Sequence, residues 1–175
     1  MAAYRYDSLG RLTDQFVQVT GAALPTGRNG DLGPGAVNDA RHTHYEYDAA
    51  GNQTLIVDPA GQRVVKTYDF LGRLETKTYA QHAPGPDGGV VYPEPVRTVY
   101  KYDPSGNPVR VNETKRFSAT SGDIVETVVS EYDHLERLVT QTNPDGKIVR
   151  SRFNAAGDRL AETDPDGVTT TTEYD

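Results

Sequence analysis

Apolar and polar residues alternate along most of this chain, in short runs that end at turn-forming residues. Residues 167–174 (GVTTTTEY) are rich in β-branched and aromatic residues, which favour strands because they lose side-chain freedom in a helix. We predict one strand over residues 167–174 and a second over residues 159–163. Residues 154–157 (NAAG) and 164–167 (DPDG) carry the Asx, Pro and Gly residues typical of tight turns.

The same pattern recurs at a fixed step. Tyr47 and Tyr68 are separated by 21 residues, and so are Tyr132, Phe153 and Tyr174. A period of this length indicates a repeat architecture. We therefore predict an all-β fold, an antiparallel β-hairpin repeat array that forms an open spiral sheet as a single domain over residues 1–175. The repeats start near residues 4, 45, 66, 100, 130 and 151, with a partial repeat near residue 172.

Hairpin turns are predicted at residues 7–10, 48–51, 69–72, 103–106 and 133–136. Glu136 stands where the other turns have Gly, so a positive φ is expected there at a cost of roughly 1 kcal/mol. Two Gly- and Pro-rich stretches, residues 20–44 and 81–97, interrupt the repeats as loop insertions, and we expect proteases to cut first within residues 20–40 and 81–95. The chain stops at the start of a hairpin turn, so we expect a fragment whose open sheet edges self-associate.

Composition narrows the possible classes. Hydrophobic residues make up 35% of the chain and mean hydropathy is −0.65, which suits a sheet more than a deep core. Cysteine is absent, which excludes disulfides and thiolate metal sites. The net charge of −7 argues against a nucleic-acid partner, since phosphates require a basic face. No apolar run is long enough for membrane insertion, and the first residues lack a signal-peptide core.

Residues 4–12 (YRYDSLGRL) and 68–74 (YDFLGRL) resemble the YD-repeat, or Rhs, family, whose pattern is close to YxYDxxGRL. The other repeats keep the pattern with substitutions: Asn52 and Asn107 replace Arg, Glu136 replaces Gly, and Phe153-Asn154 replaces Tyr-Asp with Asp158 at the Arg position. The resemblance covers nearly all of the chain outside the two insertions. The family includes bacterial polymorphic toxins, the C-components of Tc toxins and teneurins.

The resemblance implies hairpins stacked into a section of a hollow shell that encapsulates or presents a toxin or other domain. It implies a non-enzymatic structural module, secreted or at the cell surface as part of a larger protein, with flanking repeats and an encapsulated C-terminal domain as partners. The alternative is a carbohydrate-binding surface with glycans as ligands. The autoproteolysis motif of the bacterial shells, of the form PxxxxDPxGL, is not found in this sequence.

Aspartates recur at one turn position, so we interpret them as structural, and we predict no catalytic residues, no cofactor and no metal site. Recurring tyrosines are interpreted as a structural ladder across neighbouring strands or as a ligand-stacking strip. The tyrosines in question are Tyr6, Tyr47, Tyr68, Tyr102, Tyr132 and Tyr174.

His42 and His44 alternate on an incoming strand, with Glu46 and Asp48 nearby, so both rings lie on one face as a zinc site requires. No third ligand has recognisable spacing, and we favour a solvated strand edge. His82 and His134 are isolated. Residues 164–167 with Glu173 resemble a calcium loop, but the Gly and Glu fall at the wrong positions, which favours a plain turn.

Overall fold

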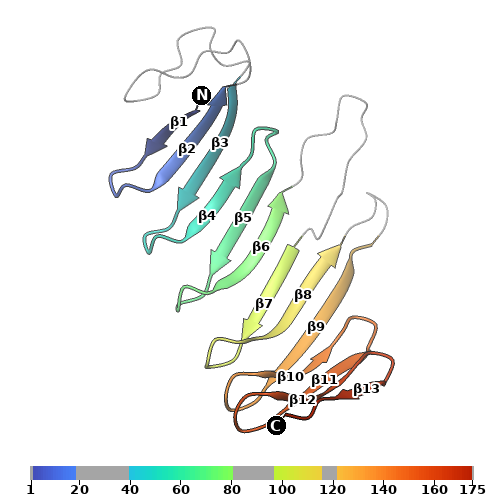
Figure 1. Ribbon diagram of the computed structural model, residues 1–175. Helices are drawn as coiled ribbons and strands as arrows, with labels where there is room; N and C mark the ends of the chain where they lie inside the picture. Colours follow the sequence, from blue (N-terminus) through green and yellow to red (C-terminus); the bar gives the residue numbers. More distant parts are fainter. Residues whose placement is uncertain (1, 19–39, 81–96, 116–121, 175) are drawn as a thin grey trace, which may run out of the picture. The chain divides into compact units, whose positions relative to one another are not determined.

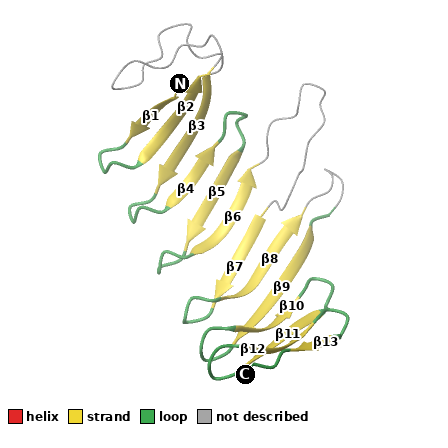
Figure 2. Cartoon of the chain, in the orientation of Figure 1, coloured by secondary structure: helices red, strands yellow, loops and turns green. Residues whose placement is uncertain are grey.

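The computed structural model describes residues 2–18, 40–80, 97–115 and 122–174. All regular structure in this part of the chain is β-strand (Figure 2). Within it, no helix is long and apolar enough to cross a membrane. The chain divides into two compact units, Met1–Val91 and Tyr92–Asp175, which we call the N-terminal and C-terminal units (Figure 1).

Six strands form the described part of the N-terminal unit: β1 (Ala2–Tyr6), β2 (Leu12–Gln18), β3 (Ala40–Tyr47), β4 (Gln53–Val57), β5 (Arg63–Tyr68) and β6 (Leu74–Ala80). Seven strands form that of the C-terminal unit: β7 (Arg97–Tyr102), β8 (Pro108–Lys115), β9 (Ile124–Tyr132), β10 (Leu138–Thr142), β11 (Ile148–Phe153), β12 (Arg159–Thr163) and β13 (Thr169–Thr171).

Within each unit every strand pairs antiparallel with the next strand in the sequence. This confirms the predicted all-β hairpin array. The predicted insertions at residues 20–44 and 81–97 fall mostly outside the described residues, and so does their expected sensitivity to proteases. Where the chain is described again, β3 already begins at Ala40 and β7 at Arg97.

The hairpin turns lie where the sequence predicts them. In the first repeat the Gly10 N–H donates to the Asp7 carbonyl at 3.0 Å, and the Asp7 N–H donates to the Arg11 carbonyl at 2.9 Å. Gly10 has a φ of 77°, and the register of β1 and β2 shifts beside the turn, as a type I turn with a bulge requires. Glu136 adopts the expected left-handed conformation, with a φ of 62°.

β13 is shorter than the predicted strand over residues 167–174. The Asp164 N–H donates to the Val168 carbonyl at 2.9 Å, so Gly167 and Val168 belong to the turn. Gly167 has a φ of 87°, which a strand does not accommodate. The strand therefore begins only at Thr169.

Strand pairing decides which residues share a face of the N-terminal sheet. Asp14 pairs with His44, Phe16 with His42 and Glu46 with Leu55, so these residues lie on one face. Tyr47 directly follows Glu46 on β3, so its side chain lies on the other face. Few side chains are fully buried in the described residues, and Phe16 (3% exposed) and Leu55 (6%) lie on the face away from Tyr47.

Candidate functional site

Each hairpin turn is held by the side chain of its first residue. The Asp7 carboxylate accepts from the N–H groups of Leu9 and Arg11, both at 2.9 Å, and its second oxygen accepts from Arg11 Nε at 2.6 Å. The backbone hydrogen bond from Arg11 and its side-chain hydrogen bond hold the pKa of Asp7 below its usual value, against the opposing effect of desolvation. The other turn aspartates likewise accept hydrogen bonds from within their own turns.

Arginine at the fifth turn position also reaches the next repeat. Arg11 Nη1 donates to the Asp48 carbonyl at 2.9 Å, and its guanidinium lies 4.9 Å from the Tyr47 ring centroid. In the C-terminal unit Arg137 Nη1 donates to the Asn154 carbonyl at 2.9 Å, and its guanidinium lies 4.7 Å from the Phe153 centroid. Both arginines thus join consecutive repeats through a hydrogen bond and a cation–π contact.

Where Arg is replaced, the side chain at this position stays within its own turn. Asn52 Nδ2 donates to Asp48 Oδ2 at 2.9 Å, and Asn107 Nδ2 donates to Asp103 Oδ2 at 3.1 Å. In the sixth repeat the two residue types are exchanged, and Asn154 Nδ2 donates to Asp158 Oδ2 at 2.8 Å. Along the sequence the fifth turn position therefore alternates between Arg and a shorter side chain: Arg11, Asn52, Arg73, Asn107, Arg137, Asp158.

Tyrosines link the repeats in the opposite direction. Tyr47 donates its hydroxyl to the Leu12 carbonyl and Tyr68 to the Gln53 carbonyl, both at 2.8 Å. Leu12 and Gln53 are the first residues of the outgoing strands of the preceding repeats. Tyr132 and Tyr174 make the equivalent bonds, at 3.4 Å to the Pro108 carbonyl and 3.3 Å to the Arg159 carbonyl.

The six tyrosines singled out from the sequence differ in their surroundings. Tyr6 and Tyr174 are 60% and 53% exposed, whereas Tyr47 and Tyr68 are half-buried. The Tyr102 ring stacks on Tyr100 of the same strand, with centroids 6.4 Å apart. The structure therefore gives Tyr47 and Tyr68 a hydrogen-bonding role between repeats that the sequence pattern did not predict. A role in stacking a ligand stays a prediction.

On the opposite face of the N-terminal sheet, β2 and β3 bring two histidines to one carboxylate. Asp14 Oδ1 lies 2.8 Å from His42 Nε2 and 2.9 Å from His44 Nδ1. Burial raises the pKa of Asp14, but hydrogen bonds from His44 and His42 outweigh this effect and leave the pKa below its usual value. The sequence singled out the two histidines and missed Asp14, because only strand register across residues 19–39 brings it to them.

The remaining candidate residues lie apart from this cluster. His134 is exposed on a hairpin turn, and His82 falls outside the described residues. Asp164 Oδ1 accepts from the N–H groups of Asp166 and Val168, both at 2.9 Å, so residues 164–167 form the predicted turn.

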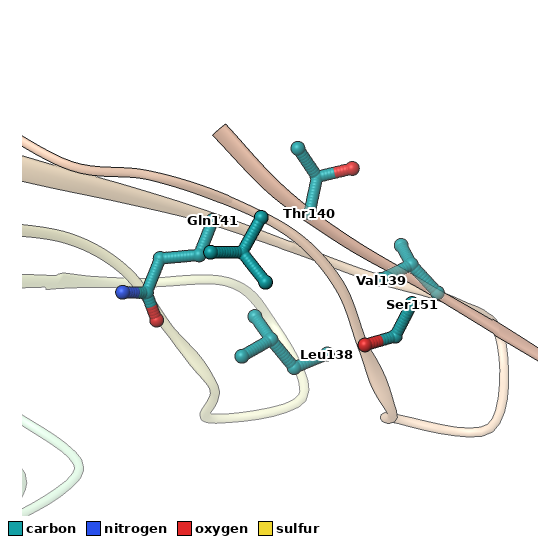
Figure 3. A pocket seen from close by; sticks show the side chains of 6 residues that line it. Leu138, Val139, Thr140, Gln141 and Ser151 are labelled. Carbon is teal, nitrogen blue, oxygen red and sulfur yellow. The ribbon is translucent and has the colours of Figure 1, made fainter. Parts of the chain in front are cut away.

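The C-terminal unit contains a hollow of about 110 Å³ over β10 and β11 (Figure 3). Leu138, Val139, Thr140, Gln141 and Ser151 line it together with Val149, and none of these residues is titratable. This hollow therefore offers no general acid or base. A wider hollow of about 430 Å³ over β10–β13 is lined by threonines with Arg150 and Arg152, and no carboxylate is among its lining residues.

The strand order and the links between turns define a structural repeat module built from β-hairpins. Residues 47–84 match the family model described as RHS Repeat, which confirms the resemblance to the YD-repeat family. No curated protein matches the chain.

Several solved structures are similar to the chain at low identity. They include TcdB2-TccC3-Cdc42 (16% identity, TM-score 0.41, 90% of this chain and 9% of that one) and TcdB2-TccC3 (15%, 0.40, 96% and 12%). A Photorhabdus luminescens Tc holotoxin pore with the TccC3-D651A mutation is also similar (15%, 0.42, 97% and 10%). The chain thus spans 9–12% of the length of these chains.

Proposed function

We propose that the chain is a section of a repeat wall whose parent protein encapsulates or presents another domain, such as a toxin. The observation that carries this proposal is the use of the recurring side chains. Asp7 holds its own turn, while Arg11 and Tyr47 tie one repeat to the next. A residue that makes the same backbone contact in successive repeats has a structural role in holding the repeats together. This supports a non-enzymatic function.

The proposal of a shell rests on the resemblance of the repeats to the YD-repeat family. The match of residues 47–84 to the RHS Repeat model supports this resemblance. On this proposal the partners are flanking repeats and an enclosed domain, and the location is outside the cell or at its surface. The strands at the edges of such a sheet offer unpaired backbone groups, so the chain on its own would self-associate edge to edge. Sedimentation over a wide concentration range measures this association, which should weaken when further repeats are added to both ends of the chain.

Protease protection in the parent protein tests the proposal. The enclosed domain should resist protease in the parent but not when it is expressed alone. Arg11→Ala combined with Tyr47→Phe should expose it, whereas Arg159→Ala, on a surface ion pair with Glu162, should not. Equal cleavage of the domain inside and outside the parent would overturn the proposal. So would saturable glycan binding that is lost in Tyr47→Ala and Tyr102→Ala variants.

A further inference from the structure

Asp14, His42 and His44 form a cluster of three side chains from two strands. One ring nitrogen of each histidine contacts Oδ1 of Asp14. Asp14 lies on β2, and both histidines lie on β3. The pairing of Asp14 with His44 and of Phe16 with His42 places the three side chains on one face of the sheet. The side chain of Asp14 is 12% exposed, and those of His42 and His44 are 44% and 35% exposed, so the cluster is open to solvent on one side.

The spacing of the three atoms suits a metal ion. Asp14, His42 and His44 each offer one ligand atom, and these three atoms lie within 4.8 Å of one another. A tetrahedral ion with bonds of 2.0–2.1 Å holds its ligand atoms about 3.4 Å apart. The two imidazole–carboxylate distances are 2.8 and 2.9 Å, so both rings need only small outward movements to admit an ion in place of the shared protons.

Surrounding groups orient the three ligands, as second-layer contacts do at metal sites. The Thr13 hydroxyl donates to the other carboxylate oxygen of Asp14 at 2.9 Å. His44 Nε2 lies 3.5 Å from Glu46 Oε1, so a carboxylate lies near the ring nitrogen that does not contact Asp14. The ring of Phe16 stacks on that of His42 at 4.4 Å with an interplanar angle of 4°, which fixes its orientation.

We propose that Asp14 Oδ1, His42 Nε2 and His44 Nδ1 bind a divalent transition metal ion of the Zn²⁺ type, which clamps β2 to β3. Two imidazoles and one carboxylate suit such an ion better than Ca²⁺ or Mg²⁺, which take mainly oxygen ligands. Three protein ligands leave one position for water. The clamp joins two strands that are separated in sequence by residues 19–39, and a link across a long loop offsets much of its closure entropy. This inference does not depend on the shell proposed above.

Zinc titration of the full chain tests this site after treatment with a chelator. Calorimetry should show one Zn²⁺ bound per chain, and Zn²⁺ should raise the melting temperature. His42→Ala, His44→Ala and Asp14→Asn should each weaken binding at least about tenfold. His134→Ala, which removes an exposed histidine from a hairpin turn, is the matched control and should bind Zn²⁺ as the wild type does.

Two results would overturn the proposal. The first is the absence of saturable Zn²⁺ binding to a wild-type chain whose circular dichroism shows folded β-structure. The second is binding that survives in both histidine variants, since this would place the ion elsewhere. His42→Ala and His44→Ala change partly exposed side chains and should keep the β-sheet spectrum, so a failure of Asp14→Asn to fold would not prevent the test.

Discussion

At the scale of single residues, Tyr47 and Tyr68 act through their hydroxyls as well as their rings. Tyr47 and Tyr68 each bond a backbone carbonyl of the preceding repeat at 2.8 Å. In the fifth-to-sixth repeat contact the same place is taken by Phe153, which has no hydroxyl, and that contact keeps the arginine hydrogen bond, from Arg137 to the Asn154 carbonyl. The ring and the hydroxyl therefore make separable contributions.

Tyr47→Phe should lower the free energy of unfolding by about 1 kcal/mol, because it removes one hydrogen bond and keeps the ring. Urea unfolding followed by circular dichroism measures this change. Tyr6→Phe is the control, since Tyr6 is 60% exposed, and it should change stability by less than about 0.5 kcal/mol. Equal losses in the two variants would contradict the role assigned to the Tyr47 hydroxyl.

Glu136→Gly should stabilise the chain by about 0.5–1 kcal/mol. Glu136 has a φ of 62°, which is strained for a residue with a Cβ atom but not for Gly. The greater loss of backbone entropy of Gly on folding offsets part of this gain. Gly10→Ala is the reverse change, and nothing lies within 4 Å of an added Cβ, so its effect is backbone strain alone. Thermal melts should show opposite shifts for the two variants, and shifts of the same sign would contradict the strain at Glu136.

At the scale of the hairpin, Arg137 serves both its own turn and the next repeat. Arg137→Ala should cost about 2 kcal/mol, since it removes charge-assisted hydrogen bonds and a cation–π contact. Arg137→Asn should cost less, because Asn52 and Asn107 show that an amide can hold the turn aspartate. Denaturant unfolding ranks the two variants.

Arg159→Ala controls for the loss of an arginine in the same unit, because its ion pair with Glu162 is exposed and should contribute little. If Arg137→Asn were as damaging as Arg137→Ala, the bond within the turn would have no value of its own. If neither exceeded Arg159→Ala, the link to Asn154 would be without consequence.

The hairpins could be predicted because their turns depend on residues close together in the sequence. Contacts between side chains of different repeats could not be predicted in this way. Asp7 and Gly10 indicate a turn within four residues of sequence. The positive φ of Glu136 was also predictable, because Glu136 occupies the turn position that is Gly in the other repeats. The recurrence of Arg four residues after Asp, in Arg11, Arg73 and Arg137, is a signal for the contact of Arg11 with Asp48, but the sequence does not show which backbone group the side chain reaches. Asp14 had no local signal, because its partners lie 28 and 30 residues away.

At the scale of the whole molecule, the turn aspartates give the chain a common sensitivity to acid. The pKa of Asp133 is lowered from 3.8 to about 2, chiefly by the side-chain hydrogen bond from Arg137 and also by backbone hydrogen bonds, which together outweigh desolvation. The pKa values of the equivalent residues, Asp7, Asp48, Asp69 and Asp103, are also lowered. These groups bind fewer protons in the folded chain than in the unfolded chain.

The stability that the turn aspartates contribute should therefore be fully present above the ordinary pKa of 3.8. This contribution should be lost as the pH falls toward about 2. Urea midpoints measured from neutral pH down to this range should fall steeply only in the acid part. Asp133→Asn should flatten the fall without preventing folding, since Asn154 occupies the same turn position in the sixth repeat. An unchanged acid profile in this variant would show that Asp133 contributes nothing to it.

The alternation of Arg with shorter side chains gives the N-terminal sheet an uneven resistance to mechanical load. β2 and β3 are joined by five residue pairs, by Arg11 and Tyr47, and by the contacts of Asp14 with the two histidines. β4 and β5 are joined by three residue pairs, by Tyr68, and by a hydrogen bond from Lys66 Nζ to Gln53 Oε1 at 2.9 Å. Asn52 stays within its own turn and adds nothing across that second boundary. Stretched from its ends, this sheet should part first between β4 and β5, and its first two hairpins should come away as one piece.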